Sequence, residues 1–360
     1  MKITRSFYTL IICCVFLLCG CKDKKNVSGG LYEHGVIITN EGNFGSNTGS
    51  VSYYNPNTDS VYNKVFEDAN NQRPLGDVVQ SFTVADEKGF IVVNNSHKVE
   101  VVLLSSFQSL GVIMAPFPRH LISVNSGKAY LTCNDAIPGH VLVINTSNLA
   151  IIDSIVVGNK PENLLLIGSK VFVANGNYGN DSTVSVIDIY TNKVINTINV
   201  GDGACNMVST DNQDIWIICQ GKKVYNGNWE VIKETDSHLV KMSASDYSIK
   251  YSKIIGMKGD GCSPFLISSD KLGYIYYAEA DGVHKINTNA TNLEDKLLIP
   301  WDNSSGYSIY GMNIDPETSN IYLLESKGFS SAGKFHIYDA TGSLLHSFNV
   351  GIAPNGAVIF

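Results

Sequence analysis

The side chains that most often carry catalysis or metal binding are scattered along this 360-residue chain. The eight histidines include no His-x-His or His-Glu-x-x-His spacing, the patterns that hold zinc on one face of a strand or helix. No Gly-x-Ser-x-Gly elbow and no glycine-rich phosphate loop is present. The sequence therefore predicts a protein that is not an enzyme and holds no metal, although His97, His120 and His140 could meet in a metal contact.

Two Asp-Gly segments recur just before expected inner strands, at 201–203 and 259–261. Asp-Gly is ordinary turn chemistry, so these segments are interpreted as turns rather than as anion or calcium sites.

The N-terminus has the pattern of an exported lipoprotein. Two basic residues precede an apolar run at 7–18, which is too short to cross a bilayer. The run ends in Leu-Cys-Gly-Cys, a lipobox-like order, so Cys21 is the predicted lipidation site. Residues 1–20 are the expected signal peptide and 21–34 a flexible tether. The alternative is an ordinary signal peptide with an incidental cysteine.

Four further cysteines follow Cys21, and their spacing matches no metal motif. Cys205 opens one expected strand and Cys219 closes the next, so the two could be neighbours. An exported protein could join them in a disulfide, but half-buried thiols are the favoured interpretation.

Composition narrows the class of protein. The chain is 44% apolar and 16% charged, with a formal net charge of −7. This mildly acidic balance argues against nucleic acid as a partner. Valine, isoleucine, tyrosine and threonine dominate the patterned segments, and asparagine, glycine, aspartate and serine separate them, as in all-β proteins.

The elements that must position any site belong to a strand-rich unit that recurs about every 44 residues. Segments 128–157 and 170–200 both run strand, polar loop, strand, short turn, strand. One unit cannot bury its own faces, so we expect seven stacked units over 35–360, an all-β seven-bladed propeller. The first unit lacks an innermost strand, which residues 353–360 would supply. This closure predicts that deleting those residues destabilises the whole ring.

Loops on one expected face are long and aromatic, whereas turns on the other are short and bland. Aromatic rings beside Asn and Gly suit a binding surface for a large, partly polar ligand or a protein, although each ring could instead pin its own loop. By position and chemistry, the predicted ligand-binding residues are Phe44, Arg73, Phe117, Arg119, Asn134, Tyr178, Trp229, Trp301, Tyr307 and Phe329.

Three quoted stretches resemble a known group. "TNEGNFGSNTGSVSYYNP" at 39–56, "LGDVVQSF" at 75–82 and "VANGNYGNDSTVSVIDIYTNKVINTINVG" at 173–201 resemble the YncE-like (YVTN-repeat) seven-bladed propeller surface lipoproteins of Bacteroidetes, BtuG-like cobalamin-binding type. The resemblance covers about 35–360. It implies an outer-membrane, lipid-anchored protein, displayed on the cell surface, that captures cobalamin or other corrinoids on the loop face. It also implies delivery of that ligand to a TonB-dependent transporter.

Cobalamin would be a transported ligand and not a cofactor, and its cobalt would travel inside it. Other functions stay open at this point: capture of a ferric siderophore or glycan, a protein-binding or adhesive propeller, or an enzyme built from ring loops.

Overall fold

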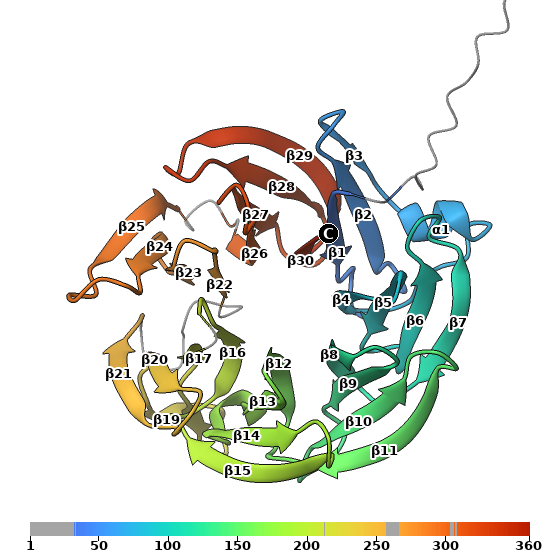
Figure 1. The fold of residues 1–360 in the computed structure, drawn as a ribbon. Coiled ribbons are helices and arrows are strands. Elements are labelled where there is room, and N and C mark those ends of the chain that lie inside the picture. Colours follow the sequence, from blue (N-terminus) through green and yellow to red (C-terminus); the bar gives the residue numbers. More distant parts are fainter. Residues whose placement is uncertain (1–31, 33, 212, 257–265, 303–305, 307) are drawn as a thin grey trace, which may run out of the picture.

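The computed structural model describes residues 32, 34–211, 213–256, 266–302, 306 and 308–360, which form a ring of sheets around a central axis (Figure 1). The predicted signal peptide, Cys21, Cys262 and Tyr307 lie outside the described residues. Within the described part of the chain, no helix has the length and hydropathy needed to span a membrane.

Seven four-stranded antiparallel sheets make the blades of the described ring, each ordered from the axis outward. Blade 1 contains β30 (Pro354–Ile359), β1 (Val36–Asn40), β2 (Ser50–Asn55) and β3 (Ser60–Tyr62). Blade 2 contains β4 (Val79–Ala85), β5 (Lys88–Val93), β6 (Lys98–Leu103) and β7 (Ser109–Met114). Blade 3 contains β8 (Pro118–Asn125), β9 (Lys128–Cys133), β10 (His140–Asn145) and β11 (Ala150–Val156). Blade 4 contains β12 (Pro161–Ile167), β13 (Lys170–Asn175), β14 (Thr183–Asp188) and β15 (Lys193–Asn199).

The remaining blades follow the same order. Blade 5 contains β16 (Ala204–Val208), β17 (Asp214–Cys219), β20 (His238–Ser243) and β21 (Ile249–Ile254). Blade 6 contains β22 (Ile267–Ser269), β23 (Tyr274–Glu279), β24 (Gly282–Asn287) and β25 (Asp295–Pro300). Blade 7 contains β26 (Ser308–Ile314), β27 (Ile321–Ser326), β28 (Ala332–Tyr338) and β29 (Leu344–Ile352). The predicted all-β, seven-bladed fold is confirmed.

Closure of the ring also follows the prediction. Strand β30 pairs with β1 from Val36↔Ile359 to Asn40↔Pro354, so the C-terminal strand becomes the innermost strand of blade 1. The backbone of Gly35 and Phe360 exchanges two hydrogen bonds of 3.2 Å. Both ends of the ring are therefore held in one sheet, which removes an open edge.

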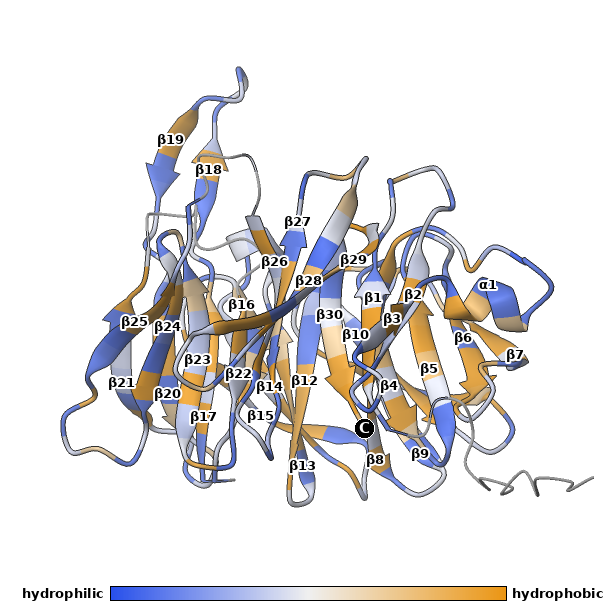
Figure 2. Ribbon diagram, turned by 90° about the horizontal axis from the view of Figure 1, so that it is seen from above, coloured by the Kyte–Doolittle hydropathy of each residue, from blue (hydrophilic) through white to orange (hydrophobic). Residues whose placement is uncertain are grey.

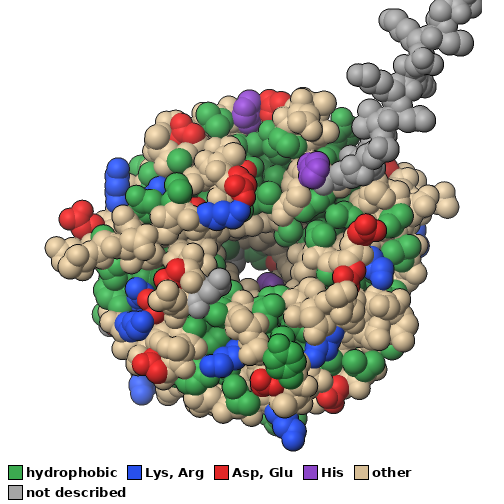
Figure 3. Space-filling model, viewed as in Figure 1, with side chains coloured by type: hydrophobic (Ala, Val, Ile, Leu, Met, Phe, Trp, Pro, Cys, Tyr) green, Lys and Arg blue, Asp and Glu red, His purple; other side chains and the backbone are tan. Residues whose placement is uncertain are grey.

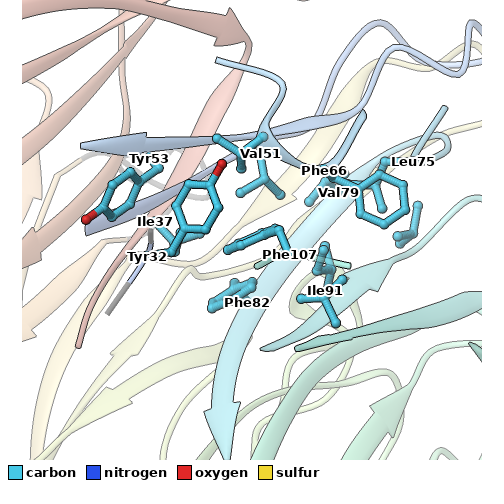
Figure 4. Close-up of a cluster of buried hydrophobic side chains, with 13 residues drawn as sticks. Tyr32, Ile37, Val51, Tyr53, Phe66, Leu75, Val79, Phe82, Ile91 and Phe107 are labelled. Atoms are coloured by element: carbon cyan, nitrogen blue, oxygen red, sulfur yellow. The ribbon is translucent and has the colours of Figure 1, made fainter. Parts of the chain in front are cut away.

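The core lies between neighbouring blades. Between blades 1 and 2, Tyr32 packs edge-on against Tyr53 and Phe107, while Phe82 stacks on Phe107 with ring centroids 6.0 Å apart (Figure 4). The second and third strands of the blades are mostly continuous buried runs, such as Phe90-Ile91-Val92-Val93 in β5, because both faces of a blade pack against its neighbours. Comparable clusters fill the spaces between the other blades.

Two faces of the ring differ in their connections. We call the loop face the one formed by the connections between blades and by the loops after each second strand, at 41–49, 94–97, 134–139, 176–182, 220–237, 280–281 and 327–331. We call the opposite face the turn face. The chain terminus at β30 lies on the turn face, and Figure 3 shows this side with the ring open at its centre.

Three elements add to the pattern of four strands per blade. The connection from β3 to β4 contains a short helix, α1 (Val65–Ala69), and the loop after β13 contains a helical turn, η1 (Asn177–Gly179). The loop between β17 and β20 contains a hairpin of β18 (Lys223–Tyr225) and β19 (Val231–Glu234). Apolar residues flank an Asn-Gly turn there, a strong hairpin signal. We call this hairpin the arm; it stands above the loop face in Figure 2.

Candidate functional site

A cavity of about 630 Å³ opens on the loop face at the axis of the ring, and every blade contributes at least one described residue to its lining. We call it the axial cavity. Three aromatic side chains lie at its mouth, Phe44 (72% exposed), Tyr178 (72%) and Phe329 (50%). They come from the loops of blades 1, 4 and 7, so the aromatic rim is assembled from segments far apart in the sequence.

The polar floor is built by a repeated backbone irregularity. Six innermost strands shift register near their first residue, so that one or two residues bulge out of the pairing. A bulge re-aims a side chain that regular alternation would send elsewhere. The bulged residues that line the axial cavity are Gln80, Arg119, His120, Glu162, Cys205, Tyr310 and Asn355.

The chain also enters these strands through a left-handed backbone. The residue just before the strand has a positive φ at Val78 (59°), Phe117 (40°), Lys160 (49°), Gly203 (75°) and Ala353 (48°). Positive φ is unfavourable for residues with a Cβ, most of all for β-branched Val78. Strain of this kind persists where the surrounding structure holds it, and here it surrounds the mouth of the cavity.

Arg119 is the basic side chain among the described residues that line the axial cavity, and its charge is already engaged. Its Nε donates to Glu162 Oε2 at 2.8 Å, and its Nη1 donates to Gln80 Oε1. Glu162 accepts a second bond, 3.0 Å long, from Asn134 Nδ2. One guanidinium therefore bridges blades 2, 3 and 4.

Glu41, in the loop after β1, forms a second polar centre, and only blade 2 separates its blade from that of Arg119. Its two carboxylate oxygens accept from Tyr310 Oη at 3.0 Å and from Asn355 Nδ2 at 3.1 Å. Burial raises the pKa of Glu41, although both hydrogen bonds and the Arg119 charge oppose that rise. Asn355 also donates to the backbone carbonyls of Val79 and Gln80, so the same side chain ties blade 1 to blade 2.

His120 also lines the axial cavity. Removal from bulk water, and then the neighbouring Arg119 charge, lowers the pKa of His120 to about 4. The ring is therefore neutral at physiological pH and offers one donor and one acceptor.

Carboxylates hold two of the aromatic loops in place. Asp77, 4% exposed, accepts from the backbone N–H of Gly45 at 2.8 Å, next to Phe44. In the Tyr178 loop, Asp181 accepts from the N–H of Asn159 at 2.7 Å. Gly179 has φ +86°, and a Cβ there would lie 2.4 Å from Gly221 O, so only glycine fits this close contact.

A smaller cavity of about 220 Å³ adjoins the axial cavity, and we call it the side pocket. Phe117 and Asn134 line it together with Arg119 and Tyr178, which it shares with the axial cavity. Phe117 packs edge-on against His97 with ring centroids 4.2 Å apart. Six of the ten predicted site residues thus lie around two adjoining cavities.

Three other predicted site residues lie away from these cavities, and Tyr307 is outside the described residues. Arg73 lies beside α1, where it forms a two-pronged pair with Glu100 at 2.7 and 3.1 Å. Trp229, 83% exposed, sits in the turn of the arm against Tyr225. Trp301 follows β25 and packs against the core of blades 6 and 7, edge-on to His336.

Cys205 and Cys219 are thiols rather than a disulfide. Cys205 Sγ donates to Ile218 O at 3.4 Å and Cys219 Sγ donates to Val200 O at 3.6 Å. Burial raises the pKa of Cys219 to about 12, so this thiol is not a nucleophile at neutral pH.

The three loop-face histidines considered for a metal contact are separate. His97 contacts Phe117, His120 faces the axial cavity, and His140 lies 3.5 Å from Asp135. Among the described residues, one other group could supply three metal ligands, Glu279, Asp281 and His284, with ligand atoms within 4.8 Å of one another.

The His284 ring, however, is already held by carboxylates on both sides, Asp281 at 2.9 Å and Asp295 at 3.0 Å. Burial opposes protonation, but these hydrogen bonds outweigh it and raise the pKa of His284 to about 9. At neutral pH the ring is therefore an imidazolium, and Lys253 also pairs with Asp295. We interpret the group as an ionic clamp and not as a metal site.

Sequence reasoning missed most of the polar floor, including Glu41, Gln80, Glu162, Tyr310 and Asn355. A signal for them exists. The innermost strands begin with two apolar residues separated by two polar, partly buried positions, as in Val79-Gln80-Ser81-Phe82 and Pro161-Glu162-Asn163-Leu164. The residue after the first apolar one is the one that enters the cavity.

Comparison with known proteins supports the fold and a family. No curated protein sequence matches the chain. A quinonprotein alcohol dehydrogenase-like protein from Bacteroides thetaiotaomicron is similar in structure, with TM-score 0.63 and 13% identity over 91% of this chain and 78% of that one. Kuenenia stuttgartiensis hydrazine synthase has TM-score 0.60 and 14% identity over 75% of this chain and 85% of that one. Apo AztD from Citrobacter koseri has TM-score 0.53 and 10% identity over 90% of this chain and 98% of that one.

At such low identity these structures show the propeller fold alone. In sequence, the profile of a family described as a domain of unknown function, DUF5074, matches residues 34–352, nearly the whole ring. The chain is therefore a seven-bladed β-propeller that belongs to the DUF5074 family.

Proposed function

We propose that this propeller is a non-catalytic capture protein that binds a corrinoid such as cobalamin on its loop face. The observation that carries the proposal is the axial cavity, which combines an exposed aromatic rim with a floor of amide, carboxyl and guanidinium groups. A corrinoid has broad apolar faces rimmed by amides. Aromatic rings suit the former, and hydrogen-bonding side chains suit the latter.

Size determines how such a ligand would be held. Pockets of about 300–1,000 Å³ enclose drug-sized molecules. A corrinoid is larger than a drug-sized molecule, so a cavity of about 630 Å³ would take only part of it. The ring of the ligand would cap the mouth against Phe44, Tyr178 and Phe329, and one peripheral arm would enter the polar floor.

The placement of the chain end suits a capture role at a membrane surface. We propose that Cys21 carries lipid and that the protein is held at the outer membrane, on the cell surface. Gly35, where the tether joins the ring, pairs with Phe360 on the turn face. The lipid would then be attached on the side opposite the axial cavity, and the cavity would point away from the membrane.

Delivery to a TonB-dependent transporter completes the proposal, in keeping with the resemblance to YncE-like, BtuG-like surface lipoproteins. The arm offers a contact for such a partner, because Tyr225, Trp229 and Ile232 are 47%, 83% and 63% exposed on a hairpin that stands above the loop face. Exposed Trp and Tyr on a protruding element are typical of binding hot spots.

The test is a calorimetric titration of the chain from residue 25 onward, which contains the whole closed ring, with cyanocobalamin. We expect one-to-one binding, weakened about tenfold by Tyr178→Ala, since an aromatic contact contributes about 0.5–1.5 kcal/mol. The matched control is Tyr190→Ala, because Tyr190 is 80% exposed between β14 and β15 on the turn face. No binding by the wild-type chain would overturn the corrinoid proposal in favour of a siderophore, a glycan or a protein ligand.

A further inference from the structure

The charges around the axial cavity are arranged in a way that selects among ligands. The charged side chains among its described lining residues are Glu41, Arg119 and Glu162, one basic and two acidic. Glu162 and Gln80 hold two of the three guanidinium nitrogens of Arg119. A cation that is already paired in this way does not attract a further anion strongly.

Besides the paired Arg119, the floor of the axial cavity contains neutral amide side chains. Gln80 lines the cavity and accepts from Arg119 through its amide oxygen, so that bond does not use its amide N–H₂ group. Asn94 and Asn206 also line the cavity, each with a neutral amide. Amides supply both donors and acceptors without charge, which matches an amide or hydroxyl arm of a ligand.

Glu41, a second carboxyl group in the lining of the axial cavity, also disfavours anions. Both of its oxygens accept hydrogen bonds from the protein, and its burial raises its pKa. A ligand carboxylate placed in the cavity would meet Glu41 and Glu162 as well as Arg119. Carrying such a charge out of water is unfavourable when the one guanidinium that could pair with it is already paired with Glu162.

We propose that the axial cavity selects a neutral amide- or hydroxyl-bearing arm over a carboxylate, and that Glu162 sets this preference by occupying Arg119. The inference rests on the proposed capture function, since it names the chemical class of the arm that enters the same site. It makes Arg119 and Glu162 the residues that determine specificity, in contrast to the aromatic rim, which binds the ligand without distinguishing its charge.

The first experiment compares cyanocobalamin with its monocarboxylic derivatives, in which one peripheral amide has been hydrolysed, each isomer titrated separately. For the wild-type chain we expect at least one isomer, the one whose carboxylate replaces the inserted amide, to bind about tenfold or more weakly than the parent. In Glu162→Gln, which keeps the shape of the side chain and removes its charge, that ratio should fall or reverse. Equal binding of every isomer by the wild type would overturn the inference while leaving corrinoid capture intact.

The matched control is Glu100→Gln, which removes the partner of Arg73 outside the cavity. It should leave the amide-to-carboxylate ratio unchanged. A shift in Glu100→Gln equal to that in Glu162→Gln would mean that general charge, and not the axial pair, sets the preference.

A second experiment needs no corrinoid. Inorganic phosphate is titrated into wild type and Glu162→Gln, with the Arg119 side-chain NMR signals as readout. We expect saturable, millimolar shifts in Glu162→Gln and none in the wild type. Phosphate binding of equal strength in both chains would overturn the inference, whether or not the chain binds cyanocobalamin.

Discussion

Arg119 and Arg73 each pair with a glutamate, but the two pairs lie in different surroundings, one at a cavity and one around a buried carboxylate. Arg119 stands at the axis and divides its donors between Glu162 and Gln80, on the blades either side of it. Arg73 lies beside α1 at the outside of blade 2 and places both prongs on Glu100, whose side chain is fully buried. The axial pair borders an open cavity, whereas the outer pair neutralises a charge sealed from water.

The comparison indicates that the Arg119–Glu162 pair serves ligand binding, whereas the Arg73–Glu100 pair serves folding. A buried carboxylate such as Glu100 needs every partner it has, and Lys98 and Ser109 add bonds of 2.9 and 2.5 Å to those of Arg73. Glu162 keeps some contact with the cavity, with 15% of its side chain exposed. Water or a ligand can therefore replace part of its bonding.

The largest loss of stability should come from deleting residues 353–360. Without these residues we expect the ring not to close, so neither arginine pair would be held in place. The deletion removes β30, the innermost strand of blade 1, together with Asn355, which bonds Glu41 and the backbone of β4. We expect loss of the cooperative thermal transition followed by circular dichroism. A truncated chain that melted as cooperatively as the full ring would contradict closure as the source of stability.

A smaller but clear effect is expected from Arg73→Ala. Removing one partner of a buried charge commonly costs about 3–5 kcal/mol. Because Lys98 and Ser109 remain, we expect about 1–3 kcal/mol from urea unfolding, with ligand affinity unchanged. Arg119→Ala should show the reverse, a changed affinity with less loss of stability. Equal losses of stability and of affinity in both variants would contradict the assignment of Arg73 to folding and of Arg119 to ligand binding.

The buried ionic clamp at His284 should make the stability of the protein depend on pH. The folded pKa of His284, about 9, lies above its ordinary value near 6.5. A raised folded pKa means that the clamp contributes stability fully below about pH 6.5 and loses it as pH rises through 9. We expect unfolding free energy to fall by about 1–3 kcal/mol between pH 6.5 and 9.5, and His284→Gln to flatten that part of the profile.

His346→Gln is the matched control for the clamp. His346 pairs with Asp59 at 2.9 Å, but both side chains are nearly half exposed, at 44% and 45%. Exposed pairs contribute little, so the pH profile of His346→Gln should follow the wild type. An equal flattening in both variants would show that burial does not distinguish the two pairs.

The smallest effect on stability should follow removal of the arm. The backbone N–H of Thr235 donates to Lys222 O at 2.9 Å, so a two-glycine linker could replace residues 223–234. All four residues of β19 are exposed, and we expect unfolding free energy to change by less than about 0.5 kcal/mol. A loss of several kcal/mol would show that the arm is part of the folding unit.

Much of the fold could be predicted because its signals are local and repeated. Apolar strand segments separated by turn residues recur in each unit. Residues 353–360 have the pattern of an innermost strand, which indicates closure of the ring from the sequence alone. Loop position alone placed Phe44, Tyr178 and Phe329 on the same face. It could not separate Arg73 from Arg119, since loop position assigned both to connections between blades, whereas Arg119 belongs to β8.

By itself, then, the sequence determined the number of blades, the closure of the ring and the aromatic character of one face, because these follow from periodicity and from residue type. Only the tertiary structure decided which polar side chains meet at the axis. Tyr310 and Glu41 are 269 residues apart, and the bulges that aim such residues inward shift a strand by one position, which exchanges its two faces. A one-residue shift leaves almost no mark on a repeating pattern, but it decides which side chains enter the cavity.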